Sequence, residues 1–311
     1  MHKGHYDGYV SGIRDKSEQR FFCMNELISD SFQSMCRQWR RVRQLSQLDL
    51  ALAAEVSQRH VSWLETGRSQ PSREMVIRLS EAMNIPIRER NQLLKSAGFS
   101  AIYSESSLND PIMAPVMRAL NHVLKNHDPL PAVVVDRFWN VKKQNQAAEL
   151  LLGLGQADDL QEDITNEQGE LNIALLTLHP KGLRRYITNW AQAAPAFIQR
   201  LKEEAIASGD PAVKEAFTRY ITLAQEDIEL ADGNKASSGK RKDEILAMPG
   251  RLLPILPLNL DIDGLQLSLF SVISTFGTPQ DITTDELRIE AFYPADEATE
   301  TFFHSMSPTQ D

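Results

Sequence analysis

The residues best suited to chemistry are polar side chains on one face of a short predicted helix, residues 58–66: Gln58, Arg59 and Ser62. Arginine can hydrogen-bond guanine through two donors, and glutamine can form the equivalent pair with adenine, in the major groove of DNA. At the start of a helix that fits the groove, such residues can read a base sequence. The alternative is an αα-hairpin whose polar face is only solvated.

The preceding segment has to hold this helix in place. Residues 47–54 are rich in Ala and Leu and predict a helix, residues 55–57 predict a turn, and Ser57 is a good N-cap for the second helix. Gly67 is typical of the position just beyond a helix C-terminus. The residues expected where the two helices cross are small or apolar: Leu50, Ala51, Ala54, Val56, Val61 and Leu64. The pattern predicts a helix-turn-helix over residues 47–66.

Several motifs in this stretch resemble the phage-repressor-type (XRE) helix-turn-helix family, over about residues 35–83. They are Leu45-Ser46-Gln47, Ala51, Val56-Ser57-Gln58 and Leu64-Glu65-Thr66-Gly67-Arg68, followed by Pro71-Ser72. The candidate DNA-binding residues are Gln47, Ser57, Gln58, Arg59, His60, Ser62, Trp63 and Arg68. Glu55 departs from the family, which commonly has Gly there. A non-glycine residue held at positive φ costs roughly 1–2 kcal/mol.

Flanking helices predicted at 31–44, 72–83 and 87–97 complete an all-α, five-helix repressor-like domain over residues 31–100. The first helix carries four arginines, and two interpretations of them remain open. In repressor-like domains an Arg of the first helix often pairs with the Glu late in the recognition helix, which here would join Arg40 to Glu65. Alternatively, all four arginines are solvated or touch phosphate.

Charge separates this domain from the rest of the chain, whose net charge is −9 overall. Residues 31–100 carry 11 Lys+Arg and 6 Asp+Glu, whereas residues 101–311 carry 18 and 31. The excess of positive charge lies where phosphate attraction requires it. Two cysteines form no disulfide framework and indicate reduced thiols. No apolar stretch is long enough to span a membrane, and no signal peptide is recognisable. We therefore expect a cytoplasmic protein with no membrane partner.

The remaining chain divides into a mobile N-terminal extension at 1–30, a Ser-rich linker at 101–109, a second domain at 110–305 and a tail at 306–311. Strands are predicted at 132–135, 138–143, around 256–260, at 265–276 and at 286–293. They predict an α+β domain with a five-strand antiparallel sheet and helices. Among those helices, 189–208 is the longest predicted run. Residues 231–243 predict a polar, mobile loop.

Three stretches of this domain resemble the MmyB-like ligand-binding domain, over about residues 110–303. They are Pro131–Asp136 with Trp139 and Asn145; Leu178–Arg184 with Asn189-Trp190; and Thr275–Thr283, continuing through Glu286-Leu287-Arg288 to Phe292–Asp296. The resemblance implies a PAS-like sheet with helices on one face that enclose a small-molecule pocket. The candidate ligand-binding residues are Trp139, Arg184, Trp190, Phe270, Val272 and Phe292. We expect an apolar ligand such as a fatty acid, with Arg184 or Arg185 facing its carboxylate. The alternative is that the aromatic residues simply fill the core.

No catalytic arrangement is apparent. Gly153-Leu154-Gly155 follows a helix and not a strand, which excludes a dinucleotide loop, and we expect no metal, no cofactor and no enzyme activity. The sequence predicts a one-component bacterial transcription regulator that binds double-stranded, palindromic operator DNA as a homodimer. The alternative is a DNA-binding regulator whose C-terminal domain is a dimerisation or partner-docking platform without a ligand.

Overall fold

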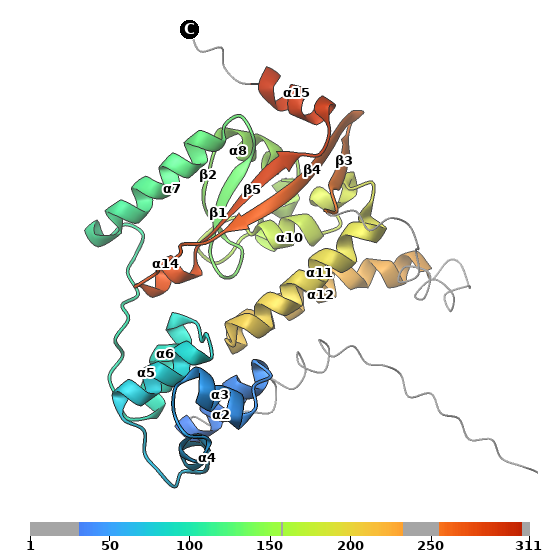
Figure 1. Ribbon diagram of the computed structural model, residues 1–311. Coiled ribbons are helices and arrows are strands. Elements are labelled where there is room, and N and C mark those ends of the chain that lie inside the picture. The colour runs from blue at the N-terminus through green and yellow to red at the C-terminus, as the bar shows by residue number, and fades with distance from the viewer. Residues whose placement is uncertain (1–30, 157, 233–254, 307–311) are drawn as a thin grey trace, which may run out of the picture.

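The computed structural model describes residues 31–156, 158–232 and 255–306, with side chains of 158 and 225–232 left aside. The predicted extension at 1–30, the tail after Met306 and most of the predicted loop at 231–243 lie outside these residues. Within them the chain forms an N-terminal helical domain and a C-terminal domain built on one sheet (Figure 1). The predicted fold class is confirmed.

The N-terminal domain consists of five helices, as predicted. They are α2 (Phe32–Val42), α3 (Gln47–Ala53), α4 (Gln58–Thr66), α5 (Arg73–Ala82) and α6 (Ile87–Ser96). Serine hydroxyls accept hydrogen bonds at the N-termini of α2 to α5, from Ser31, Ser46, Ser57 and Ser72. These bonds satisfy backbone donors that have no partner within a helix. The core between the helices includes Phe32, Cys36, Trp39, Leu50 and Val61, all buried.

The tight turn between α3 and α4 depends on Glu55, whose φ is +53°. This is the left-handed region in which the Cβ atom of an L-residue is crowded. The departure from glycine seen in the sequence therefore leaves local strain in the turn, while Ala54 and Val61 still pack in the core beside it.

The C-terminal domain has a five-strand antiparallel sheet in the order β2-β1-β5-β4-β3. The strands are β1 (Ala132–Val135), β2 (Val141–Gln144), β3 (Leu258–Ile262), β4 (Leu265–Ser274) and β5 (Arg288–Pro294). The prediction that the second strand begins at Phe138 is wrong. Asp136 Oδ1 accepts from the backbone N–H groups of Phe138 and Asn140, which closes a turn in which Trp139 has a φ of +71°.

Helices lie before, between and after the strands. They are α7 (Ala114–His127), α8 (Gln146–Gly153), α9 (Gln161–Ile164), α10 (Ile173–Leu178), α11 (Trp190–Ser208), α12 (Pro211–Asp232), α14 (Ile282–Glu286) and α15 (Glu297–Ser305), with 3-10 turns at Pro111–Met113, Asp158–Leu160 and Leu183–Tyr186. The longest is α12, with 22 residues, and not α11, which has 19. The 3.6-residue period predicts a helix in each of these two stretches, but it does not determine which of the two helices is longer.

Side chains alternate between two faces of the sheet. On the inner face, Val133, Val135 and Phe292 belong to a core shared with α10, α11 and α12. On the outer face, Ala132 and Val134 pack against α7. The expectation of helices on one face only is therefore wrong, because α7 covers part of the other face. None of the helices described is both long and apolar enough to cross a membrane.

Candidate DNA interface and effector domain

The N-terminal end of α4 presents the candidate DNA-reading surface. Ser57, Gln58, Arg59 and Arg68 are exposed, and His60, Ser62 and Trp63 are half-buried. The guanidinium of Arg59 lies 4.4 Å from the centroid of the Trp63 ring, a distance typical of a cation–π contact. Seven of the eight candidate DNA-binding residues thus lie on α4 or immediately beside it, and Arg59 is held against the helix by an aromatic neighbour.

The eighth candidate, Gln47, is half-buried at the start of α3 and contacts a buried residue of α4. Its side-chain amide donates to Glu65 Oε2 at 2.9 Å. Arg40 also reaches Glu65, donating from Nε to Oε1 at 2.6 Å and from Nη2 to Oε2 at 2.9 Å. The structure favours the pairing of Arg40 with Glu65 over four equivalent solvated arginines. Gln47 helps to position α4 through the same carboxylate.

Glu65 is almost fully buried, with 1% of its surface exposed. Burial alone would raise the pKa of this carboxyl, but the hydrogen bonds from Arg40 and Gln47 outweigh burial and hold the pKa below its ordinary value. The same pair raises the pKa of Arg40. A paired charge at this depth ties α2 to the end of the recognition helix.

Cys36, also on α2, is buried and forms no disulfide bond with any residue that the structure describes. Burial, reinforced by the negative charge of Glu65, raises the pKa of its thiol to about 12. A thiol so far from ionisation is poorly nucleophilic, so Cys36 serves as an apolar core residue.

The candidate ligand-binding residues do not all come together. Trp139, Trp190 and Phe292 contribute to the core on the inner face of the sheet, and the Arg184 guanidinium lies 4.6 Å from the centroid of the Trp190 ring. Phe270 instead stacks on Tyr293, with ring centroids 5.6 Å apart. Its cross-strand register places it on the outer face.

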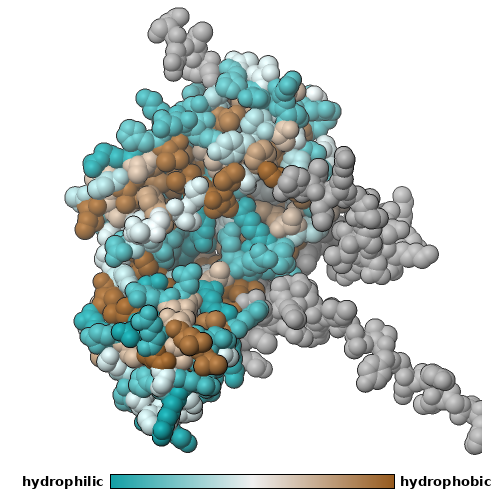
Figure 2. Space-filling view, viewed as in Figure 1, coloured by the Kyte–Doolittle hydropathy of each residue, from teal (hydrophilic) through white to brown (hydrophobic). Residues whose placement is uncertain are grey.

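Val272 shares the outer face with Phe270, because residues two apart in a strand point the same way. It is 45% exposed. Four of the six predicted residues can therefore contribute to one site on the inner face, and two cannot. In the view of Figure 2, apolar residues form separate surface areas on both domains, and Ile112, Val123 and Val272 are among the exposed large apolar residues.

Trp139 is the most deeply placed of the inner-face candidates, with 1% of its surface exposed. Its indole Nε1 donates to Glu204 at 3.0 Å, and the guanidinium of Arg200 lies 4.3 Å from its ring centroid. Both partners belong to α11. The positive φ of Trp139 directs its side chain from the turn toward that helix, which the strand predicted at this position would not have required.

Arg200, Glu204 and Glu290 form a polar cluster that the sequence did not predict, in which Arg200 and Glu204 are half-buried and Glu290 is buried. Arg200 Nε donates to Glu204 at 3.1 Å, and its Nη1 lies 3.4 Å from Glu290 Oε1. Glu290 is 4% exposed, and burial raises the pKa of its carboxyl despite the nearby arginine. The only signal for this cluster in the sequence was the position of Glu290 inside a predicted strand. Which face of the sheet Glu290 occupies depends on the strand register.

Two buried donors lack hydrogen-bond partners among the described residues: Arg200 Nη2 and, ten residues before it, Trp190 Nε1. Both residues lie on α11. An unsatisfied buried donor is costly in an apolar surrounding, so each would gain from an acceptor brought by a bound molecule.

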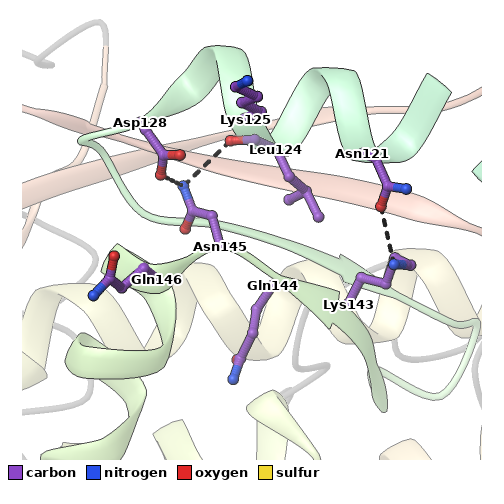
Figure 3. Close-up of a pocket in the computed structure, with 8 residues that line it drawn as sticks. All are labelled: Asn121, Leu124, Lys125, Asp128, Lys143, Gln144, Asn145 and Gln146. Atoms are coloured by element: carbon purple, nitrogen blue, oxygen red, sulfur yellow. Dashed lines mark hydrogen bonds between the residues drawn. The ribbon is translucent and has the colours of Figure 1, made fainter. Parts of the chain in front are cut away.

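A separate groove of about 430 Å³ lies between α7, β2 and the start of α8 (Figure 3). Asn145 bridges its walls by donating to Asp128 at 2.9 Å, and Lys143 Nζ donates to Asn121 at 2.9 Å. None of the predicted ligand-binding residues lines this groove, whose side chains are mostly polar. It is therefore distinct from the inner-face site.

His179 is a single histidine at the end of a helix. It occupies the C-cap of α10, and its Nδ1 accepts from the backbone N–H of Lys181 at 3.2 Å. Across the described residues, no group of three or more His, Cys, Asp or Glu side chains is arranged to hold a metal ion.

Comparison with known families gives two matches. The MmyB-like transcription regulator ligand binding domain matches residues 116–306, and a helix-turn-helix family matches residues 37–90. No curated protein matches the chain. A solved structure titled "Structure of an RNA-binding Light-Oxygen-Voltage Receptor" is 12% identical, with 94% of this chain and 67% of that chain covered, at a TM-score of 0.20. A score this low carries no argument about the fold.

Proposed function

Because the chain belongs to the family with an MmyB-like transcription regulator ligand binding domain, we propose that it is a one-component bacterial regulator whose DNA affinity is set by a small apolar ligand. A DNA-binding domain joined to a ligand-binding domain is the coarse function that both family matches give. The proposal adds the reading residues, the class of ligand, the homodimer and a cytoplasmic location. A ligand acts by binding one arrangement of the protein more tightly than another.

The observation that carries the DNA-binding part is the exposed N-terminus of α4. Gln58 and Arg59 are exposed and are suited to adenine and guanine respectively. One helix reads only a few base pairs, so we propose a homodimer on a palindromic operator whose half-sites lie about one helical turn apart.

The DNA test begins with selection of duplexes from a random library by the wild-type protein. Arg59→Ala is then titrated against the selected duplex and its single-base variants. We expect a loss of roughly 1–3 kcal/mol confined to one base position in each half-site. Arg41→Ala, at an exposed arginine of α2, is the control and should leave the base preference intact. An unchanged base preference in Arg59→Ala would refute the assigned reading residues.

The ligand part is supported by the inner face of the sheet. Trp139, Trp190 and Phe292 supply apolar surface there, and the unpartnered donors Trp190 Nε1 and Arg200 Nη2 offer hydrogen bonds to an acceptor. We propose a fatty acid or a similar amphiphile, which has this combination of a long apolar part and an oxygen-bearing end. Arg184, beside Trp190, is a further candidate to face the carboxylate.

The ligand test is mass spectrometry of small molecules released from the purified full-length protein, followed by thermal shifts with saturated fatty acids of increasing length. A bound amphiphile, or a shift that Trp190→Phe reduces, would support the proposal. Phe270→Leu, on the outer face, is the control and should keep the shift. No bound molecule and no shift with any acid would favour the alternative of a docking platform with a filled core.

A further inference from the structure

The helix α11 connects the core of the C-terminal domain, here called the effector domain, with the DNA-binding domain. Its first residue, Trp190, packs on the inner face of the sheet, and its C-terminal end reaches the helical domain (Figure 1). With 19 residues it is roughly 28 Å long. The helix contains Pro195 near its N-terminal end, and the remaining turns form a continuous element that can carry a displacement from one domain to the other.

At the C-terminal end of α11, Gly209 lies directly against Trp39 of α2. A Cβ atom on Gly209 would be 2.3 Å from two carbon atoms of the indole ring. Arg43 Nη2 donates to the backbone carbonyl of Ala207 at 3.3 Å and to that of Asn84 at 3.0 Å. Trp39 is only 5% exposed and belongs to the core of the DNA-binding domain, so the end of α11 contacts that core. We call this the first contact.

A second contact joins α14 to the first turn of α6. The N-cap of α6 is Pro86, which makes no side-chain cap hydrogen bond. Asp285 of the effector domain supplies one, because its Oδ2 accepts from Ile87 N at 3.1 Å. Arg88 forms two hydrogen bonds with Glu286, at 2.6 and 3.0 Å. One domain thus caps a helix of the other.

Arg137 links the two contacts. It forms an ion pair with Asp210, the residue after Gly209, and its Nη1 lies 3.5 Å from Glu286 Oε1. Arg137 also belongs to the turn that carries Trp139, which packs against Arg200 of α11. The turn that bears the deepest inner-face residue is therefore attached to both contacts.

The linker between the domains lies in the same region and is held along much of its length. Asn91 of α6 accepts from the backbone N–H groups of Ile102 and Tyr103, at 3.0 and 3.2 Å. Asp281, just before α14, accepts from Ser104 Oγ at 2.8 Å. The segment predicted as a Ser-rich linker forms an ordered strap between α6 and α14, which limits independent movement of the domains.

We propose that the two contacts and Arg137 form a clamp through which the effector domain sets the orientation of the DNA-binding domain. A displacement of α11, or of the turn carrying Trp139, is transmitted to α2 and α6 together. The recognition helix α4 lies at the far end of the DNA-binding domain from α11 (Figure 1), so the clamp leaves it free for DNA. The inference rests on the proposed function for its regulatory meaning, but the clamp itself is testable without DNA or ligand.

The decisive variant is Gly209→Ala, which places a Cβ atom against the Trp39 ring. Gly169→Ala is a matched control, because both glycines have similar positive φ values, +69° and +75°, whereas a Cβ on Gly169 meets nothing within 4 Å. Both variants carry the same kind of backbone strain. Only one of them pushes α11 away from α2.

Amide hydrogen exchange in the full-length protein measures the clamp. In Gly209→Ala we expect about tenfold faster exchange in the last turn of α2 and also in the first turns of α6. The effect at α6 is the one that a clamp predicts, because Arg137 joins Asp210, next to Gly209, to Glu286 beside α6. In Gly169→Ala exchange at both places should match the wild type. Equal exchange in the two variants, or an effect confined to α2, would overturn the proposal.

A second experiment tests the regulatory role by measuring affinity for DNA. It uses duplexes selected by the wild-type protein, in which the spacing between half-sites is varied one base pair at a time. We expect the wild type and Gly169→Ala to prefer one spacing and Gly209→Ala to bind the different spacings within about threefold of one another. An unchanged spacing preference would overturn the regulatory role of the clamp. Failure of the wild type to select any DNA would count against the proposed function, while the exchange experiment still decides on the clamp.

Discussion

Removing the Arg40 guanidinium should destabilise the DNA-binding domain more than any other substitution of a single charged residue on α2. Arg40→Ala leaves Glu65, 1% exposed, without the two hydrogen bonds at 2.6 and 2.9 Å. Removing one partner of a buried ion pair costs about 3–5 kcal/mol, because the other charge stays buried. Gln47 still donates to Glu65, so we expect about 3 kcal/mol, at the lower end of that range.

The appropriate assay is native-state amide hydrogen exchange of α2 and α4 in the full-length protein, since a protein with two domains need not unfold in one step. A loss of about 3 kcal/mol corresponds to exchange faster by roughly a hundredfold. Arg41→Ala, at an exposed position one residue along the same helix, is the control and should change exchange by less than about threefold.

A second variant tests the stated cause. If the cost comes from an uncompensated buried carboxylate, Glu65→Gln in the Arg40→Ala background should recover a large part of the stability. The reasoning would be refuted by an Arg40→Ala cost below about 1 kcal/mol, or by a double variant no more stable than Arg40→Ala.

The pH dependence gives an independent check. The folded-state pKa of Glu65 lies below its ordinary value of 4.5, because the hydrogen bonds from Arg40 and Gln47 outweigh the effect of burial. The stability that Glu65 contributes is therefore fully present above pH 4.5 and is lost as the pH falls through the depressed pKa. In Arg40→Ala the effect of burial on the Glu65 pKa is no longer outweighed, so this acid-induced loss should shrink or reverse, because protonation of Glu65 removes the uncompensated buried charge.

Three further predictions concern single positions. Glu55→Gly should stabilise the domain by about 1 kcal/mol in thermal unfolding, since it relieves a φ of +53°; a lower midpoint would contradict the strain. Burial and the charge of Asp210 raise the pKa of Glu89 to about 7 from 4.5, so its contribution to domain docking is fully present below pH 4.5 and is lost as the pH rises through about 7. The protection of α6 against amide hydrogen exchange should decrease over this pH range in the wild type and should not depend on pH in Glu89→Gln. In a Cys23→Ser background, iodoacetamide at pH 8 should modify Cys36 only as fast as the domain opens, because burial raises the pKa of this thiol to about 12; rapid modification would contradict that burial.

The sequence by itself determined the elements whose signals are local. Serine N-caps, Gly67 and the 3.6-residue period gave the five helices of the DNA-binding domain, and Ser57 caps the recognition helix as predicted. A short apolar run predicted the first strand and alternation predicted the later ones, although the second strand begins at Val141 and not at Phe138. These patterns are readable because capping and amphipathicity depend on residues within a few positions of one another. The family motifs then indicated that a helix-turn-helix domain is followed in the same chain by an MmyB-like domain.

Tertiary structure decided everything that depends on strand register and on contacts between distant segments. Phe270 and Phe292 both looked like pocket residues, but the pairing of β4 with β5 puts them on opposite faces, and a shift of one residue would exchange those faces. The carboxyl group of Glu290 is buried because the same register places it on the inner face.

The long-range contacts were equally beyond the reach of local patterns. Arg40 had two open interpretations until α2 and α4 were placed side by side. The capping of α6 by Asp285 joins residues 198 positions apart, and no periodicity within either segment encodes it. The sequence determined which helices and strands form; their packing decided which side chains meet and how one domain holds the other.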